Sequence, residues 1–187
     1  MRKLIAVFLV VIMLTGCKVS DNTALNQFLE FRNKVGHASG CSVVVNVTAD
    51  YGDAIYYFGM DCKYLSTGDM EFTITSPDTI NGITGRIQNG KGQFIFDEQV
   101  VVFEPLADNQ ITPALAPWLI MKSLTGGYIS SFETARGMHQ GVIEDSFGGV
   151  TYTVDVWTDN EALPVRGEIL WQGRRILSVD IIAFEIL

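Results

Sequence analysis

The sequence predicts an α+β fold, in which one strongly curled antiparallel sheet of about nine to eleven strands carries two or more helices on its concave face. Apolar and polar residues alternate between turn signals along most of the chain, a pattern typical of antiparallel strands. Helical spacing occurs instead near residues 21–35 and 113–124. A single antiparallel sheet of this size twists until it curls or closes, and helices are the natural cover for its concave face.

The chain begins with a leader that ends at a cysteine. Arg2 and Lys3 precede an apolar run, and the sequence Leu-Thr-Gly-Cys closes at Cys17. These features indicate a secretory signal peptide over residues 1–16, and the run is too short for a spanning helix of about 20 residues. The last four residues resemble the lipobox of bacterial lipoproteins. The resemblance implies that Cys17 carries the acyl (palmitate) anchor and that residues 17–23 tether the protein outside the bacterial cell membrane. The alternative is an ordinary signal peptide with an incidental cysteine.

The charge balance argues against nucleic acid as a partner. The chain has 13 basic and 21 acidic residues, a formal net charge of −8, and such a surface repels phosphate backbones and anionic lipid headgroups. Membrane attachment must therefore come from the lipid, because no basic patch is available to supply it. Residues 24–187 suit a single domain that is long enough to bury a substantial core.

Two segments are predicted to be helical. Residues 21–35 start with capping side chains, place their apolar residues mostly on one face, and stop at Gly36. Residues 113–124 start at Pro113, and the following Gly-Gly pair ends them. Pro117 either kinks this second helix or marks its true start.

The rest of the chain is predicted to form strands joined by tight turns. Asn89-Gly90 and Gln172-Gly173 are strong hairpin signals. The predicted strands cover residues 41–48, 54–62, 70–75, 80–88, 93–96, 99–103, 128–134, 138–145, 150–158, 164–171 and 174–186.

The first two strands carry the other two cysteines. A two-residue turn at Tyr51-Gly52 would place Cys41 opposite Cys62 as a non-hydrogen-bonded pair, where Cα atoms approach to about 4.5 Å. That spacing permits a disulfide, and an extracytoplasmic compartment favours one. The alternatives are two independent buried thiols, or a three-residue turn that shifts the register by one.

Two stretches of the chain resemble the LolA/LolB-like lipoprotein-carrier superfamily. Residues 72–85 look like its strand–proline–strand step, and residues 163–184 look like its closing hairpin. The lipobox matches the tethered relatives found in Gram-positive bacteria, and it departs from the soluble carriers, which lack one. The resemblance covers residues 24–187. It implies a half-barrel whose open cavity is lidded by helices and binds acyl chains or lipidated proteins.

Such a cavity would be lined by apolar strand residues and closed by a helix. The lining candidates are Tyr56, Phe58, Phe72, Ile74, Phe94, Phe96, Phe103, Tyr152 and Trp157. The lid candidates in the second helix are Trp118, Leu119 and Met121. The alternative for both sets is ordinary core packing.

The sequence shows no catalytic or metal-binding constellation. His37 and His139 have no ligand partners at zinc spacing, and there is no G-x-S-x-G elbow, H-E-x-x-H motif or P-loop. We therefore expect no enzyme activity, no cofactor and no metal. Two functions remain open: a tethered protein that binds acyl chains or a lipidated protein in its cavity, or a structural or signalling lipoprotein that binds a protein or cell-wall partner with its outer surface.

Overall fold

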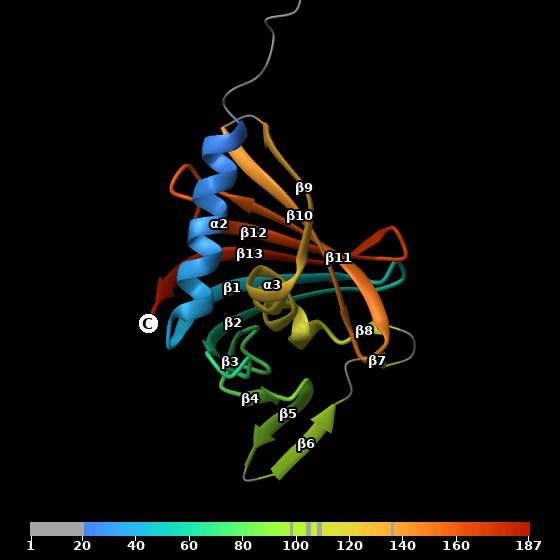
Figure 1. Ribbon diagram of the computed structural model, residues 1–187. Helices are drawn as coiled ribbons and strands as arrows, with labels where there is room; N and C mark the ends of the chain where they lie inside the picture. Colours follow the sequence, from blue (N-terminus) through green and yellow to red (C-terminus); the bar gives the residue numbers. More distant parts are fainter. Residues whose placement is uncertain (1–20, 98, 104–105, 108–109, 136) are drawn as a thin grey trace, which may run out of the picture.

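Figure 1 shows a computed structural model of the chain, which describes residues 21–97, 99–103, 106–107, 110–135 and 137–187. The described helical elements are α2 (Asp21–His37), the 3-10 turn η1 (Pro113–Leu115) and α3 (Ala116–Gly126). The strands are β1 (Gly40–Asp50), β2 (Ile55–Leu65), β3 (Met70–Ser76), β4 (Thr84–Gln88), β5 (Lys91–Phe96), β6 (Gln99–Phe103), β7 (Leu106–Ala107), β8 (Gln110–Ile111), β9 (Tyr128–Ala135), β10 (Met138–Phe147), β11 (Val150–Thr158), β12 (Pro164–Trp171) and β13 (Arg174–Ile186).

The strands form one antiparallel sheet of 11 strands, in the order β6-β5-β4-β3-β2-β1-β13-β12-β11-β10-β9, and β7 and β8 form a separate ribbon. The prediction of an α+β fold with a large antiparallel sheet and two helices is confirmed. The predicted signal peptide and the lipidation site Cys17 lie outside the described residues.

Side-chain alternation gives the sheet a buried face and a more polar face. On β1, Val43, Val45 and Val47 are buried, whereas Asn46 between them is exposed. We call the side of the buried valines the inner face, since both helices pack on it, and the other side the outer face. Apolar residues therefore alternate along the strands because only one face of the sheet is covered.

Helix α3 lies at the centre of the inner face. Its main sheet contacts are with β2 and with β10 to β13. A Cβ atom at Gly167 of β12 would collide with the side chain of Ile120, so glycine at this position allows the helix to approach the sheet closely. Pro117 lies in the first turn of α3, after the 3-10 turn, and therefore marks the true start of this helix.

Helix α2 covers another part of the inner face. In α2, the Phe28 ring packs on Phe132 of β9 and the Phe31 ring packs on Phe184 of β13. The ring centroids are 5.4 Å apart in each pair. Its other main contact is α3. The two helices together therefore cover the central strands and the β9 end of the sheet, and Figure 1 shows the β5–β6 hairpin away from both.

Two parts of the sheet that are distant in strand order meet beside α3. Six strands lie between β4 and β10, and the seven inter-strand spacings would add up to about 34 Å in a flat sheet. Phe147, at the end of β10, nevertheless packs against Gly90 in the β4–β5 turn, where a Cβ atom would overlap its ring. The Phe147 ring also makes an edge contact with Trp118 of α3, at 4.8 Å between centroids.

Two of the predicted hairpin turns are confirmed. Gln88 pairs with Lys91 around Asn89-Gly90, and Trp171 pairs with Arg174 around Gln172-Gly173. Both central residues of each turn have positive φ, the conformation that two-residue hairpin loops require. The predicted strand over residues 80–88 starts later, at Thr84, because residues 77–83 form turns instead.

The predicted register of the β1–β2 hairpin is wrong. Asp50 pairs with Ile55, so the loop holds four residues, and the Tyr51 N–H donates to the Ala54 carbonyl at 3.0 Å. The longer loop shifts the register by two residues, and Cys62 therefore lies opposite Val43 instead of Cys41. Diagonal neighbours are farther apart than a disulfide allows.

The predicted disulfide is accordingly not present. Cys41 and Cys62 are both free thiols on the inner face. Burial raises the pKa of Cys41 to about 12 and raises the pKa of Cys62 as well. Both cysteines therefore behave as small buried apolar residues.

Candidate functional site

The strand register places most of the predicted cavity residues on one face of the sheet. Tyr56 and Phe58 pair with the inner-face residues Ala49 and Val47 of β1. The inner-face candidates are Tyr56, Phe58, Phe72, Ile74, Phe94, Phe96, Phe103 and Tyr152. Trp157 lies on the outer face, where the guanidinium carbon of Arg166 is 6.0 Å from its ring centroid. Trp157 therefore cannot line an inner-face cavity.

These residues form a gradient from buried to exposed. Phe72, Ile74 and Tyr152 are core residues, at most 6% exposed. Phe58, Phe94 and Phe103 are partly buried, whereas Tyr56 and Phe96 are 54% and 58% exposed. The core is thus continuous with aromatic surface that reaches solvent.

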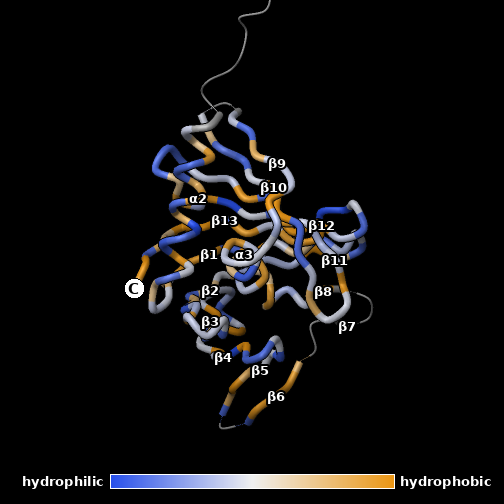
Figure 2. The backbone as a smooth tube through the Cα atoms, in the orientation of Figure 1, coloured by the Kyte–Doolittle hydropathy of each residue, from blue (hydrophilic) through white to orange (hydrophobic). Residues whose placement is uncertain are grey.

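One exposed part of this gradient lies on β5 and β6 and continues from the buried Phe72 of β3. Ring centroids are 5.8 Å apart between Phe72 and Phe94, and 4.5 Å apart between Phe94 and Phe103. Phe96 and Val101, each 58% exposed, extend the same surface. We call Phe72, Phe94, Phe96, Val101 and Phe103 the aromatic end of the inner face. Figure 2 shows hydrophobic residues along most of β6 and part of β5.

A hollow lies beside Tyr56. It has a volume of about 410 Å³, and its lining includes Tyr51, Tyr56, Ile111 and Pro113. The Tyr51 hydroxyl donates to the Ile111 carbonyl at 2.6 Å, which joins the β1–β2 loop to β8. Burial, and to a smaller extent the neighbouring Tyr56, raises the pKa of Tyr51 to about 12, so this hydroxyl remains a donor at physiological pH. The volume lies within the range of small-ligand pockets, about 300–1,000 Å³.

The predicted lid residues are packed into the core in this conformation. Trp118, Leu119 and Met121 are between 2% and 4% exposed. The Trp118 indole N–H donates to the Gly68 carbonyl in the β2–β3 turn at 2.8 Å. Helix α3 therefore fills the middle of the inner face, and its role as a lid stays a prediction.

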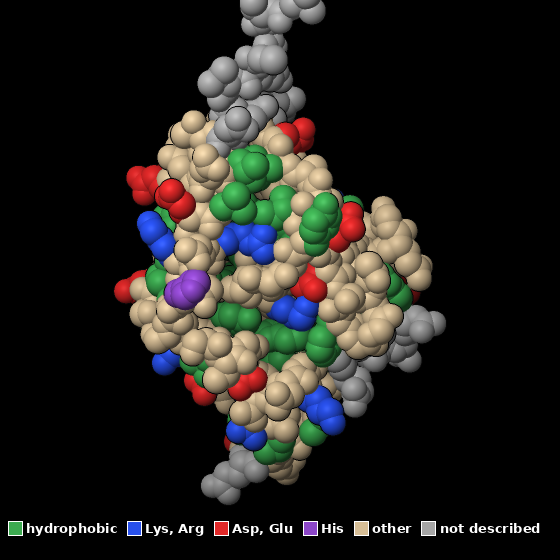
Figure 3. Space-filling view, viewed as in Figure 1, with side chains coloured by type: hydrophobic (Ala, Val, Ile, Leu, Met, Phe, Trp, Pro, Cys, Tyr) green, Lys and Arg blue, Asp and Glu red, His purple; other side chains and the backbone are tan. Residues whose placement is uncertain are grey.

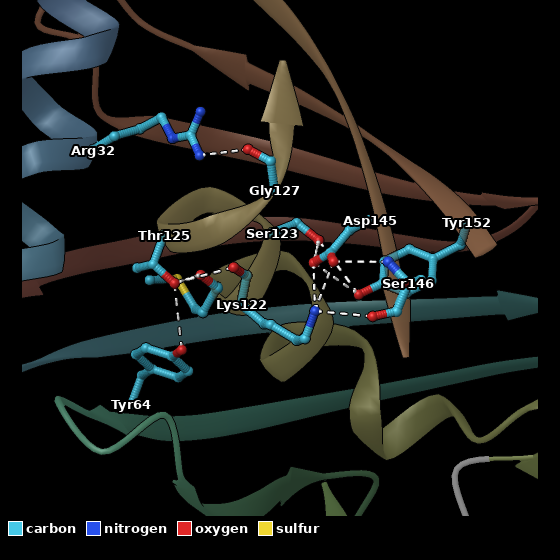
Figure 4. A network of polar contacts seen from close by, with 10 residues as sticks. Arg32, Tyr64, Lys122, Ser123, Thr125, Gly127, Asp145, Ser146 and Tyr152 are labelled. Carbon is cyan, nitrogen blue, oxygen red and sulfur yellow. Dashed lines mark hydrogen bonds and ion pairs between the residues drawn. The ribbon is translucent and has the colours of Figure 1, made fainter. Parts of the chain in front are cut away.

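A polar network that sequence reasoning missed holds α3 to β10 (Figure 4). Lys122 Nζ lies 2.7 Å from both carboxylate oxygens of Asp145. The same carboxylate accepts hydrogen bonds from the hydroxyls of Ser123 at 3.0 Å and Tyr152 at 3.2 Å. Burial alone would raise the pKa of Asp145, but the bonds from Lys122, the Ser146 N–H and Ser123 outweigh it and hold this pKa below its ordinary value.

A second set of polar contacts holds the C-terminal end of α3. Arg32 of α2 donates to the carbonyls of Leu124 at 2.6 Å and Gly127 at 2.8 Å, which satisfies acceptors that the helix end leaves open. Thr125 lies 3.5 Å from the Tyr64 hydroxyl of β2. These contacts had only a weak signal in the sequence. The signal was a charged residue within an apolar segment, Lys122 in the second helix and Asp145 on a strand, because a charge in such a position needs a partner of opposite sign.

The outer face carries two polar grooves. One, of about 490 Å³, is lined by residues of β1 to β5, among them Lys63, Glu71 and Arg86. The other, of about 250 Å³, includes Arg166 and Arg175, which both lie within ion-pair distance of Glu168. The lining of both grooves includes several charged side chains beside apolar ones, whereas the aromatic end of the inner face has none.

Across the residues that the structure describes, no group of three or more His, Cys, Asp or Glu side chains is arranged to hold a metal ion. The same residues include no helix of the length and hydrophobicity that crossing a membrane requires. Seen from the side of the helices, apolar side chains are visible across the middle of this face and near the N-terminal part of α2 (Figure 3).

No family model matches the chain, and no curated protein matches it either. Among solved structures, it is similar to a LolA superfamily protein from Nitrosomonas europaea, with 12% identity over 91% of this chain and 94% of that one, and a TM-score of 0.48. It is also similar to the lipoprotein LppX from Mycobacterium tuberculosis (13% identity, 89% and 97% coverage, TM-score 0.41). LprF from Mycobacterium bovis is a further similar structure (12% identity, 88% and 93% coverage, TM-score 0.40).

Proposed function

We propose that the chain is a lipid-anchored, non-catalytic protein of the bacterial cell surface that binds acyl chains, of a lipid or of a lipidated protein, on the inner face of its sheet. The observation that carries the proposal is the aromatic end of the inner face. Its exposed rings are continuous with the hydrophobic core, and ligand pockets are mainly apolar surfaces of this kind.

A curled sheet is part of the proposal. A sheet that curls around α3 explains how one 11-residue helix contacts both β2 and β10 to β13. It also explains why Phe147 reaches Gly90 although six strands separate β10 from β4. Curling of this kind forms the half-barrel that the sequence resemblance implies, with α3 inside it and the aromatic end at its open edge.

The choice of an apolar ligand follows from the exposed surface. Large apolar side chains that stay in water on a monomeric protein mark a binding site when they are contiguous. Phe96 and Val101 lie on the inner face of neighbouring strands, next to the partly buried Phe94 and Phe103. An acyl chain that lies along these residues would remove its own apolar surface and that of the rings from water. Such burial contributes a favourable free energy of about 25 cal/mol per Å².

The valines of β6 offer a matched test of the inner face. Val101 points to the inner face and Val100 to the outer face, and they are 58% and 55% exposed. We expect Val101→Lys to reduce the uptake of an acyl chain about tenfold or more, because a charge then lies where the chain packs, while Val100→Lys leaves uptake unchanged. Native mass spectrometry of a soluble chain starting at residue 18, with palmitate added, measures both. If Val101→Lys and Val100→Lys took up equal amounts of palmitate, the inner face would be ruled out as the binding site of the acyl chain.

The membrane anchor has a separate test. We expect Cys17→Ala to abolish labelling of the chain by radioactive palmitate in bacteria and to release it from the membrane fraction. The control is Cys41→Ala, which changes a buried thiol of the core and should leave labelling and fractionation unchanged. Palmitate incorporated into the Cys17→Ala chain would contradict the predicted lipobox.

One observation favours a second function, in which a protein or cell-wall partner binds the outer surface. Helix α3 fills the centre of the inner face, and the largest groove described above, of about 490 Å³, lies on the outer face. A soluble chain that carries no lipid after purification and takes up no palmitate would favour this second function.

A further inference from the structure

The edge strand β6 is apolar on both of its faces. Val101 lies on the inner face, and Val100 and Val102 on the outer face, each between 55% and 58% exposed. β6 is the first strand in the sheet order and pairs with β5 on one side. Its residues Gln99–Phe103 include neither charge nor proline. Most natural proteins protect an edge strand with such residues or cover it. Within the described part of the chain no element pairs with this edge of β6, and an edge of this composition points to a partner.

Among the residues that the structure describes, β5 is the only strand that pairs with β6, which leaves the backbone groups on the other edge of β6 without a partner strand. Phe96 and Gln99 close the two-residue loop of the β5–β6 hairpin, so they form a hydrogen-bonded pair, and Val101 with Phe94 forms the next one. Val100 and Val102 lie at the alternate positions, and their N–H and C=O groups therefore point away from β5. A lipid does not satisfy such a row of donors and acceptors, whereas an added strand does.

The predicted anchor holds the opposite part of the molecule to the membrane. Only residues 18–20 separate Cys17 from the start of α2 at Asp21, a span of at most about 14 Å. Figure 1 shows the start of α2 at one end of the molecule and the β5–β6 hairpin at the other. The hairpin therefore projects away from the membrane that carries the anchor.

We propose that β6 binds an extended segment of another protein by strand addition, with apolar residues of that segment packing on Val100 and Val102 on the outer face and beside Val101 on the inner face. The orientation of this surface rests on the anchor in the proposed function. A second copy of the chain fits less well. Two β6 strands paired in one continuous sheet would put the two α2 helices, and with them the two anchors, at opposite ends of the dimer.

The test uses the full-length anchored chain in lipid nanodiscs. The probe is a fluorescein-labelled heptapeptide of alternating lysine and valine, which is apolar on one face and carries charge opposite to the chain's net −8. Its matched control has the same sequence with every backbone amide N-methylated, which removes the N–H donors of both edges and keeps the charge. We expect saturable binding of the first peptide by fluorescence anisotropy, and binding at least about tenfold weaker for the second.

Variants of the same strand locate the binding edge. Val102→Pro removes one free N–H, a change that an edge strand tolerates, and we expect it to weaken peptide binding about tenfold or more. Val102→Thr keeps the N–H and should bind within about twofold of the wild type. Circular dichroism checks that both variants are folded, and the N-methylated peptide tests the edge without any variant.

Three results would overturn this proposal. They are equal binding of the two peptides, unchanged binding by Val102→Pro, and a dimer in analytical ultracentrifugation that Val102→Pro dissociates, which would make a second copy the occupant. Soluble Cys17→Ala chain should bind the peptide as the anchored chain does. Palmitate uptake by Val101→Lys tests acyl-chain binding on the inner face, whereas peptide binding tests strand addition at the edge of β6. The two proposals can therefore fail independently.

Discussion

Replacing Trp118 with alanine is expected to lower the free energy of unfolding by about 3–5 kcal/mol, the cost typical of removing a buried large aromatic side chain. Trp118 is 4% exposed, its ring packs against Phe147, and its indole N–H satisfies the Gly68 carbonyl at 2.8 Å. The alanine variant leaves a cavity beside α3 and an unpaired carbonyl in the β2–β3 turn. Urea denaturation followed by circular dichroism measures the change.

The control for this variant is Trp157→Ala. Trp157 has the same side chain but lies on the outer face under Arg166, so its loss should cost about 1 kcal/mol or less. If both variants lose the same stability, α3 is not the element that holds the inner face together.

Replacing Asp145 with alanine is expected to lower the free energy of unfolding by about 2–4 kcal/mol. The carboxylate is largely buried and receives bonds from Lys122, Ser123 and Tyr152. Its removal leaves a partly buried ammonium and two hydroxyls without their acceptor, and breaking such a pair costs more than the pair contributes. Asp61→Ala on the outer face of β2 is the control, because Asp61 is exposed, and it should change stability by less than about 0.5 kcal/mol.

The contribution of Asp145 should also depend on pH. Its pKa is depressed in the folded state, so the unfolded chain binds the proton first as the pH falls. The stabilisation is therefore complete above the unfolded pKa of about 4 and is lost as the pH falls through the lower folded value. We expect the stability difference between wild type and Asp145→Asn to be constant from about pH 5 to 7 and to shrink below about pH 4. If the stability difference instead grew as the pH fell, the pKa of Asp145 would have to be raised in the folded state, which would contradict this account.

Most of the fold could be predicted from alternation and turn chemistry. The strands β9 to β13 were predicted within about two residues at each end, because glycine turns such as Gln172-Gly173 separate clear period-two patterns. Both helices were also found from their apolar spacing, although Gly36, predicted to end the first one, lies inside α2, which ends at His37.

The register of the β1–β2 hairpin could not be predicted in the same way. Asp50-Tyr51-Gly52-Asp53 fits a two-residue turn by its composition, but the loop runs from Tyr51 to Ala54. In this loop the Tyr51 hydroxyl donates to the Ile111 carbonyl, 60 positions away. A contact so distant in sequence leaves no local signal. The same limit applies to the Asp145 network, whose members come from α3, β10 and β11.

The cavity-lining residues stay predictions, but the strand register shows which of them share a face. Phe58, Phe94 and Phe103 lie on the inner face. Trp157 followed the same sequence pattern, yet its neighbours Val156 and Thr158 are the buried residues, so its side chain lies outside. Alternation shows which residues share a face, but the packing of the helices decides which of them stay open to a ligand.

The most direct test of acyl-chain binding at the inner face is fluorescence quenching by a fatty acid brominated on its acyl chain. Two variants of the soluble chain each keep one tryptophan, either Trp118 beside the inner face or Trp157 on the outer face, with the other tryptophans replaced by phenylalanine. Our account expects saturable quenching of Trp118 and none of Trp157. Quenching of Trp157 alone, or of neither tryptophan at saturating fatty acid, would contradict it.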